Sequence, residues 1–204
     1  MKKKLVFATN NVKKIEEVKA LLIACGQEIA DRYEILSLRD IGCNEDIPET
    51  GNTLSANAMQ KAEYVHVHYH VDCFADDSGL EVRALGMDPG VRSARYAADE
   101  GFDHDADANN AKLLRNMKHV HDRTAQFRTV ITLLMDGKML EFEGICRGII
   151  TEEPRSNRLG FGYDPIFQAD GKTQTFAEMP LEEKNLISHR GKAVRALVEY
   201  LGQA

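Results

Sequence analysis

Short apolar runs alternate with amphipathic stretches through the first third of the chain. Residues 5–8 are apolar and predict a short buried strand, and over 12–25 apolar side chains recur at helical spacing with lysines and glutamates between them. Residues 34–38 indicate a second strand, 40–53 a polar loop, and 54–68 a second helix. The chain therefore opens with a strand, a turn and a helix, and then continues in the same alternation.

The middle of the chain combines a short strand, a long loop and a helix. Residues 73–75 are apolar and predict a third strand, which we expect to end abruptly at Asp76-Asp77-Ser78-Gly79. Glycine and proline mark residues 86–101 as a long ordered loop, and residues 103–120 indicate a helix. We thus expect two adjacent aspartates at the carboxyl end of a buried strand.

A β-hairpin is the clearest signal in the remaining part of the chain. Two β-rich runs within 127–150 are joined by Asp136-Gly137-Lys138, a sequence that favours antiparallel pairing. Residues 160–167 indicate a glycine-aromatic turn that enters another strand, and 181–201 indicate a helix interrupted near 188–191. Helices that alternate with both parallel-type and hairpin strands predict an α/β fold with a mixed, twisted β-sheet flanked by helices.

Length and composition favour a single domain. The chain has 204 residues, no run approaches the roughly eighteen apolar residues of a membrane span, and the N-terminal lysines lead straight into an apolar strand. No Cys-x-x-Cys pair occurs, so we expect neither disulfides nor structural zinc from the four cysteines, Cys25, Cys43, Cys73 and Cys146. We therefore expect one domain over residues 1–204 that has no membrane partner and stays in the cytoplasm.

The charge restricts the class of ligand. The formal net charge is -6, whereas binding along a nucleic acid requires a positive stripe that displaces counterions. We therefore expect no nucleic-acid partner. A small anionic ligand requires only a local cluster of lysine and arginine, helped by a metal ion.

The first candidate site is a place for phosphate. Thr9-Asn10-Asn11-Val12-Lys13-Lys14 lies between the first strand and its helix, where backbone N–H groups and the helix dipole favour an anion. The alternative is an asparagine helix cap followed by surface lysines. Because the glycines of a Walker loop are missing, this segment taken alone favours the helix cap with surface lysines.

The second candidate site is a place for a divalent cation. The adjacent carboxylates of Asp76 and Asp77 can hold Mg²⁺ by one oxygen and polarise or deprotonate a water by another. Glu49, in the polar loop, could add a carboxylate to the same ion. The alternative is a tight turn, because Asp, Ser and Gly are all turn residues, with a solvated glutamate elsewhere.

Two further stretches could bind a base and sugar. Residues 160–165 combine backbone flexibility, aromatic faces and a carboxylate, which suits a stacked base, although a hairpin turn with core aromatics gives the same pattern. Lys184, His189 and Arg190 bring cationic groups to the C-terminal helical segment, where a solvated helix face is the alternative. His66, His68 and His70 alternate as metal ligands on a strand would, but they fall at the end of a helical pattern that would point them apart.

The order and spacing of these motifs resemble the inosine/xanthosine triphosphate pyrophosphatase family, the Ham1-like proteins, from about Val6 to Leu201. The resemblance rests on Thr9-x-Asn11-x-x-Lys14, Glu49-Thr50-Gly51, Asn57-Ala58 with Lys61-Ala62, Ala75-Asp76-Asp77-Ser78-Gly79-Leu80, Pro89-Gly90 with Ser93-Ala94-Arg95-Tyr96, Phe161-Gly162-Tyr163-Asp164-Pro165-Ile166-Phe167, and Ile187-Ser188-His189-Arg190-Gly191. The departures are Ser156 and Ala98, where glycine is usual, and the segment from His66 to His70, which matches nothing characteristic.

The resemblance implies an elongated sheet with two lobes, a nucleotide cleft between them, Mg²⁺ as cofactor and a homodimer. It implies Glu49 and Asp77 as metal ligands and Asp77 as proton acceptor with Asp76 beside it. It also implies substrate binding at Thr9, Asn10, Asn11, Val12, Lys13, Lys14, Ser78, Phe161, Gly162, Tyr163, Asp164, Lys184, His189 and Arg190.

The implied activity is hydrolysis of ITP, dITP and XTP to the monophosphate and pyrophosphate, which removes deaminated purines from the nucleotide pool. Donors from His189 or Arg190 would match a 6-oxo group, whereas a 6-amino group would place donor against donor. Each buried group left unsatisfied costs about 1–3 kcal/mol, so adenine would be disfavoured. Two alternatives remain: a related enzyme for pyrimidine or modified nucleoside triphosphates, and a nucleotide-binding protein without catalysis.

Overall fold

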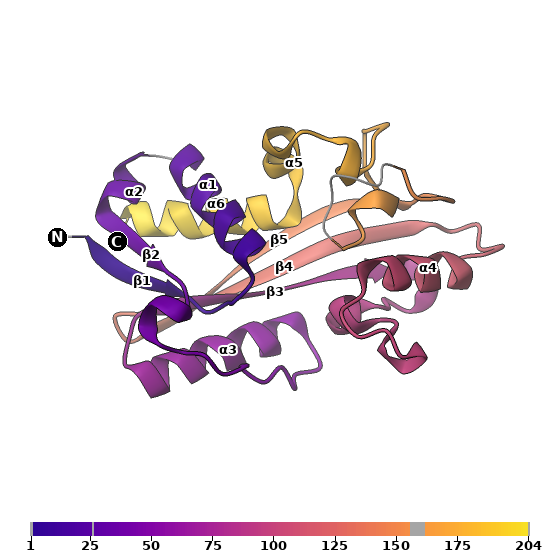
Figure 1. Ribbon diagram of the computed structural model, residues 1–204. Helices are drawn as coiled ribbons and strands as arrows, with labels where there is room; N and C mark the ends of the chain where they lie inside the picture. Colours follow the sequence, from indigo (N-terminus) through magenta and orange to yellow (C-terminus); the bar gives the residue numbers. More distant parts are fainter. Residues whose placement is uncertain (1, 26, 156–161, 204) are drawn as a thin grey trace. The chain divides into compact units, whose positions relative to one another are not determined.

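The computed structural model describes residues 2–25, 27–155 and 162–203, and its elements follow one another as Figure 1 shows. The strands are β1 (Lys3–Phe7), β2 (Tyr33–Leu36), β3 (Cys73–Val82), β4 (Thr124–Met135), β5 (Lys138–Ile150) and β6 (Phe167–Ala169). The α-helices are α1 (Val12–Cys25), α2 (Gln27–Arg32), α3 (Leu54–Tyr69), α4 (Ala106–Asn116), α5 (Leu181–Ile187) and α6 (His189–Gln203). No helix in these three ranges is both long and apolar enough to cross a membrane.

The strands form one mixed sheet in the order β2-β1-β3-β4-β5-β6. β1 pairs in parallel with β2 and with β3, and β5 pairs antiparallel with β6. The β4–β5 turn has positive φ at both Asp136 (51°) and Gly137 (72°), as a two-residue hairpin turn requires. The predicted α/β class and mixed sheet are therefore confirmed.

The chain divides into two compact units, and each has its own apolar core. The first unit contains Met1–Asp77, Thr129–Gly144 and Arg190–Ala204, and the second contains Ser78–Arg128 and Ile145–His189. In the second unit, residues of β3 and α4 pack with a group of aromatic side chains that includes Phe127, Phe167 and Phe176.

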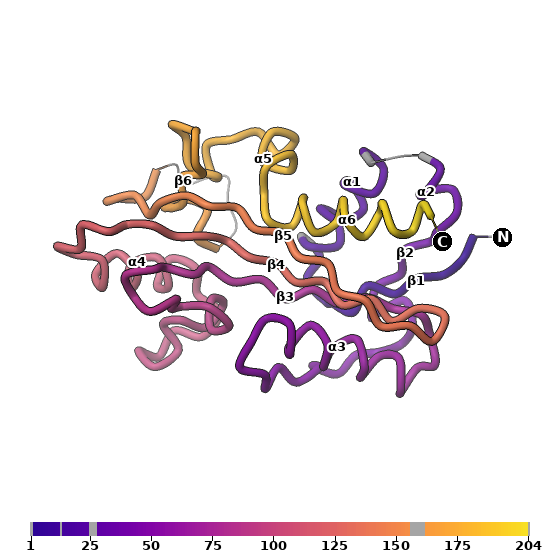
Figure 2. Tube along the Cα trace, turned by 180° about the vertical axis from the view of Figure 1, so that it is seen from behind, coloured from indigo at the N-terminus to yellow at the C-terminus, as the bar shows by residue number. Residues whose placement is uncertain are grey.

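Alternation along β1 and β3 sorts the core of the first unit into two layers. Leu5, Phe7 and Phe74 pack with α1 and α6, whereas the intervening residues Val6 and Ala8 pack with α3. Figures 1 and 2 show the same arrangement, with α1 and α6 on one face of the sheet and α3 on the other. Because side chains alternate along a strand, neighbouring residues of β3 face different helices.

One predicted boundary is wrong, and it concerns the two aspartates. β3 does not end at Asp76 but continues through Asp77, Ser78 and Gly79 to Val82. Turn-forming residues are accepted here because β3 is a central strand with neighbours on both sides. The parallel partner β1 does stop nearby, since its last paired residue, Phe7, lies opposite Phe74. The aspartates thus follow the carboxyl end of β1 rather than that of β3.

The other predicted helices and loops differ from the structure only in their bounds and in short additional helices. The predicted helix over 103–120 is shorter, because Asp105 caps α4 by accepting from the backbone N–H of Ala108. Short 3₁₀ helices occupy parts of the expected loop over 86–101, and α2 was not predicted. The expected interruption of the C-terminal helix is confirmed at Ser188, whose extended backbone separates α5 from α6.

Candidate active site

The turn between β1 and α1 aims a lysine at β3. The side chain of Thr9 accepts a hydrogen bond from the backbone N–H of Asn11, and the Asn11 side chain accepts one from the N–H of Lys14. Asn11 therefore caps the helix start, as the alternative interpretation of this motif proposed. The cap does not exclude the functional interpretation, because Lys14 Nζ lies 2.8 Å from Asp76 Oδ1.

Asp76 is a buried carboxylate on the α1 and α6 side of β3. Besides Lys14 it contacts Arg190, whose Nε lies 3.4 Å from Asp76 Oδ2. Burial would raise the pKa of Asp76, but the two cations outweigh it and hold the pKa far below its ordinary value. Burial lowers the pKa of Lys14, against the attraction of Asp76. Asp76 is thus an ionised, fully engaged group.

Asp77 points to the opposite side of β3, toward α3. Its Oδ2 accepts a hydrogen bond of 3.0 Å from Asn57 Nδ2, and its Oδ1 lies 3.7 Å from Lys61 Nζ. Burial raises the pKa of Asp77 in spite of the nearby lysines. A carboxylate with a raised pKa is a better proton acceptor than an ordinary one.

Lys61 lies between Asp77 and Glu49, the third acid predicted for the site. Its Nζ lies 2.5 Å from Glu49 Oε1, so one ammonium group contacts two carboxylates that are distant in sequence. Burial would lower the pKa of Lys61, but the surrounding carboxylates together raise it. The predicted convergence of Glu49 and Asp77 is therefore present, with a buried lysine between them.

Sequence reasoning assigned no role to Asn57 and Lys61, although both belong to a recognised motif. They are four residues apart on α3, so both lie on the buried face of that helix. Asn57 also accepts from the backbone N–H of Gly51 through Oδ1, which ties the loop of Glu49 to α3. In the sequence, the signal that could have identified them is the spacing of four residues between an asparagine and a lysine, which places both on one face of a helix.

The donors around Lys61 suit a hard divalent cation. Glu49 and Asp77 offer carboxylate oxygens, the ligands that Mg²⁺ prefers, and a positive group already lies between them. Within the described part of the chain, no group of three or more His, Cys, Asp and Glu side chains could hold a metal ion. Two carboxylates completed by substrate phosphate and water is a common arrangement for Mg²⁺.

The candidate residues Tyr163, Asp164, Lys184 and His189 belong to the second unit. Lys184 Nζ lies 2.7 Å from Asp164 Oδ2, so two predicted substrate-binding groups are paired. The hydroxyl of Tyr163 donates to the carbonyl of Ser93, and the His189 ring stacks on Phe127 at 4.5 Å between centroids. Phe161, Gly160 and Ser156 lie outside the described residues.

Two buried asparagines of α4 anchor the loops of the second unit. Asn110 donates to the carbonyl of Gly162 at 3.0 Å, and Asn109 bonds to the backbone of both Ala94 and Ala97. Asn110 thus holds the segment that contains Tyr163 and Asp164, and Asn109 holds the segment from Ala94 to Ala97.

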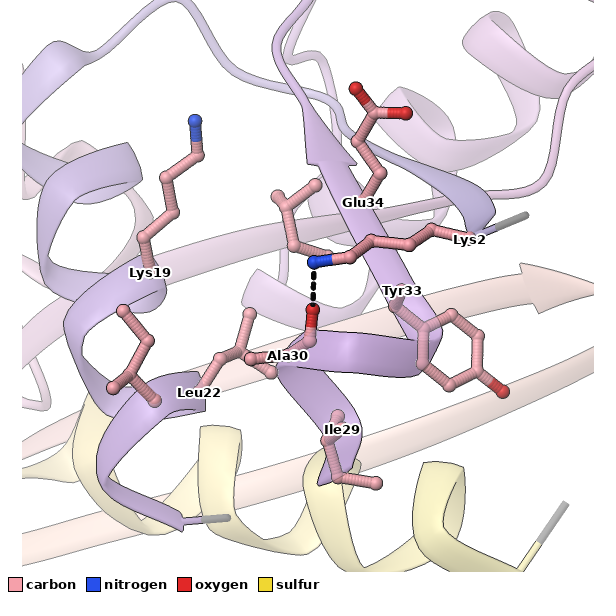
Figure 3. Close-up of a pocket in the computed structure, with 9 residues that line it drawn as sticks. Lys2, Lys19, Leu22, Ile29, Ala30, Tyr33 and Glu34 are labelled. Carbon is pink, nitrogen blue, oxygen red and sulfur yellow. Dashed lines mark hydrogen bonds between the residues drawn. The ribbon is translucent and has the colours of Figure 1, made fainter. Parts of the chain in front are cut away.

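Two histidines and a hollow in the first unit are separate from the candidate active site. His66 and His68 each use Nδ1 for a backbone carbonyl, those of Val71 and Tyr64. A hollow of about 660 Å³ is lined mainly by apolar side chains together with Lys2 and Lys19. In Figure 3, Lys2 Nζ reaches the carbonyl of Ala30, 2.7 Å away. None of the described candidate residues forms part of its wall.

The Ham1 family matches residues 5–200, which contain all of the acids and lysines of the candidate active site. The chain belongs to the Ham1 family. Similar Ham1 relatives include the dITP/XTP pyrophosphatase of Christiangramia forsetii, which is 54% identical over 98% of this chain and 100% of the relative. The dITP/XTP pyrophosphatase of Flavobacterium johnsoniae is 51% identical over 97% of each chain.

Solved Ham1 structures have the same fold along their whole length. A HAM1 protein from Coxiella burnetii superimposes with a TM-score of 0.87 at 34% identity, covering 99% of this chain and 100% of that one. The Ham1 protein of Staphylococcus aureus gives a TM-score of 0.85 at 36% identity, covering 98% and 99%. The family resemblance expected from the motifs is thereby confirmed.

Proposed function

We propose that this Ham1 chain hydrolyses non-canonical purine nucleoside triphosphates, namely dITP, ITP and XTP, to the monophosphate and pyrophosphate. The observation that carries the proposal is the first unit's cluster of two aspartates on opposite sides of β3, each paired with a lysine. Membership of the Ham1 family, whose similar members are named dITP/XTP pyrophosphatases, supplies the reaction and the class of base.

Asp77 is the proton acceptor of this reaction. Its raised pKa makes it a stronger base toward a water that attacks the α-phosphorus, and Asn57 orients it through one oxygen. Glu49 and Asp77 would hold Mg²⁺, which when bound supplies positive charge to the phosphate oxygens and lowers the pKa of water. On the α1 and α6 side of β3, opposite to Asp77, Asp76 keeps the Lys14 ammonium in place.

Lys14 and Lys61 supply the electrostatic part of the catalysis. Attack on the α-phosphorus builds negative charge on its oxygens and on the departing pyrophosphate. Fixed ammonium groups stabilise that charge more in the transition state than in the ground state, which raises kcat. Thr9 to Lys14 would hold the triphosphate, because this segment begins a helix and ends in a lysine directed at the aspartates.

The second unit supplies base recognition in this proposal. Ser78 and the segment Phe161 to Asp164 would line the base and sugar, with Lys184 beside Asp164 and with His189 as a donor to a 6-oxo group. We assign the triphosphate to Thr9–Lys14 of the first unit and the base to the candidate residues of the second unit; Arg190, the other predicted base donor, belongs to the first unit, where it pairs with Asp76 and Glu17.

The proposal also includes the oligomeric state, the location and the metal ion. We propose a homodimer and a cytoplasmic location, on the family resemblance, and Mg²⁺ as the physiological ion, on the oxygen donors of Glu49 and Asp77. Gel filtration at several concentrations tests the dimer. Replacing Mg²⁺ by Ca²⁺, which prefers more ligands and longer bonds, tests the ion.

A substrate panel tests the activity. Purified protein with Mg²⁺ is given dITP, ITP, XTP, dATP, dGTP, dTTP and UTP, and pyrophosphate and phosphate are measured separately. We expect pyrophosphate from the first three at a kcat/KM at least about tenfold above that of dATP, whose 6-amino group leaves one buried donor unmatched. Equal or faster pyrimidine turnover would favour the pyrimidine enzyme, and binding without product would favour a non-catalytic protein.

A further inference from the structure

A chain of four alternating charges lies on the α1 and α6 side of β3. Lys14 contacts Asp76, Asp76 contacts Arg190, and Arg190 Nη1 lies 2.5 Å from Glu17 Oε2. Two positive and two negative groups alternate, so the chain of charges is neutral as a whole. Glu17 belongs to it without touching either aspartate in any described contact.

The position of Glu17 follows from helix periodicity. It comes three residues after Lys14 in α1, so both side chains leave the same face of the helix. Arg190 is the second residue of α6 and directly follows the break at Ser188. Figure 2 shows α1 beside α6, and Glu17 spans from one helix to the other.

Burial makes this ion pair costly to keep for stability alone. The side chains of Arg190 and Glu17 are 6% and 13% exposed. Glu17 Oε1 is buried and has no hydrogen-bond partner among the described residues. Well-packed apolar groups commonly replace such a pair with no loss of stability, so a buried pair is better explained by the geometry that it fixes.

The ion pair between Glu17 and Arg190 fixes the direction in which the Nε–H group of Arg190 points. A guanidinium is planar, and its donors form a rigid fork. When Glu17 holds Nη1, the Nε of Arg190 is turned toward Asp76 Oδ2. Without Glu17, the fork could rotate and bind Asp76 through two nitrogens, which would draw the carboxylate away from Lys14.

We propose that Glu17 is a positioning residue for the proposed hydrolysis, holding Arg190 so that Asp76 and Lys14 keep their places on the α1 and α6 side of β3. The inference rests on the proposed function, since it concerns the same site. Glu17 acts only through Arg190, and it is predicted to affect the chemical step rather than substrate binding.

The test compares Glu17→Gln with Glu16→Gln, its exposed neighbour on the same helix. With dITP and Mg²⁺, Glu17→Gln should lower kcat by about tenfold while KM changes by less than about twofold, as expected when an interaction of the transition state is lost. Glu16→Gln should match the wild type. A kcat for Glu17→Gln equal to that of Glu16→Gln, or a loss confined to KM, overturns the inference.

A double-mutant cycle tests the route through Arg190. If Glu17 acts through Arg190, Glu17→Gln should reduce kcat by less than about twofold in an Arg190→Gln background, because residues that act as a unit are not additive. If the effects of Glu17→Gln and Arg190→Gln on kcat multiply in the double variant, Glu17 does not act through Arg190. If Glu17→Gln does not fold, Glu17→Asp replaces it: a partial loss of kcat at unchanged KM supports the inference, and wild-type kcat overturns it.

Wild-type activity separates the two proposals. If the wild type releases no pyrophosphate from dITP, the proposed function fails and the inference fails with it. If the wild type is active and Glu17→Gln is equally active, only the positioning role fails.

Discussion

Asp76 and Asp77 are neighbours in the sequence with different chemical surroundings. Consecutive residues of a strand point to opposite faces, so Asp76 meets the cations of α1 and α6 while Asp77 meets Asn57 and Lys61 of α3. The first has a strongly lowered pKa and the second a raised one. Two carboxylates whose pKa values are pushed apart are typical of a divided catalytic task.

Asp77→Asn should abolish the reaction while the fold remains. The amide has the shape of the carboxylate but cannot accept the proton, so kcat for dITP should fall by about a thousandfold. Burial disfavours the charged form of Asp77, so the neutral amide should leave the melting temperature within about 5 °C of the wild type. Steady-state kinetics and thermal unfolding measure both; near-normal kcat would disprove the role of Asp77.

Lys61→Met tests the ammonium group between Glu49 and Asp77. The substitution keeps most of the side-chain volume but removes the charge, leaving two carboxylates to repel each other. We expect kcat to fall by about a hundredfold, the effect of losing one preorganised electrostatic group. Lys118→Met, at an exposed position in the second unit, is the matched control. Equal kinetics for the two variants would remove Lys61 from the mechanism.

At the scale of elements, Gly79 allows β3 to pass close to the backbone of Gly90. A Cβ on Gly79 would lie 2.4 Å from the carbonyl oxygen of Gly90, which is backbone and cannot move aside cheaply. Gly79→Ala should lower the free energy of unfolding by about 1–3 kcal/mol, as overpacking does. Gly202→Ala, whose Cβ would meet Ile29 at an ordinary 3.6 Å, is the control. Urea denaturation that finds equal stability would contradict the close approach.

Local patterns predicted most elements because the causes of those elements are local. Helical spacing gave α1 and α3, and two turn residues gave the β4–β5 hairpin. The continuation of β3 was missed because a central strand is fixed by its neighbours, which a turn-like sequence does not reveal. The six-residue α2 was missed because so short a helix carries little periodicity.

The candidate site was predictable in its types of residue but not in its pairings. Local polarity and motif spacing marked the two aspartates, Glu49 and Lys14. The contacts that define their chemistry join residues 20 positions apart for Asn57 and Asp77, and 173 positions apart for Glu17 and Arg190. Such pairings are set by the packing of helices on the sheet, so the sequence pattern alone cannot specify them.

At the scale of the whole molecule, the two aspartates give opposite pH dependences of stability. Asp76 has a lowered folded pKa, so its contribution is present above its unfolded pKa of about 3.9 and is lost as the pH falls through the folded pKa. Asp77 has a raised folded pKa, so its charge lowers stability at neutral pH, and protonation relieves that cost.

Asp76→Asn isolates the stabilising term. In metal-free buffer at neutral pH, the variant should be less stable than the wild type by about 1–3 kcal/mol, because a buried partner of two cations is lost. The difference should shrink below about pH 4, where the wild-type carboxylate begins to be protonated in the unfolded chain. Urea denaturation across this range measures it, and a difference that stays constant to the lowest pH would refute the assignment.

Hydrolysis of dITP in ¹⁸O-enriched water tests the central claim most directly, because it reports which phosphorus the water attacks. If the acids and lysines around β3 direct water to the α-phosphorus, the label will appear in the deoxyinosine monophosphate and the released pyrophosphate will carry none. Label in the pyrophosphate, or release of labelled single phosphate, would show attack at another phosphorus and would contradict the account.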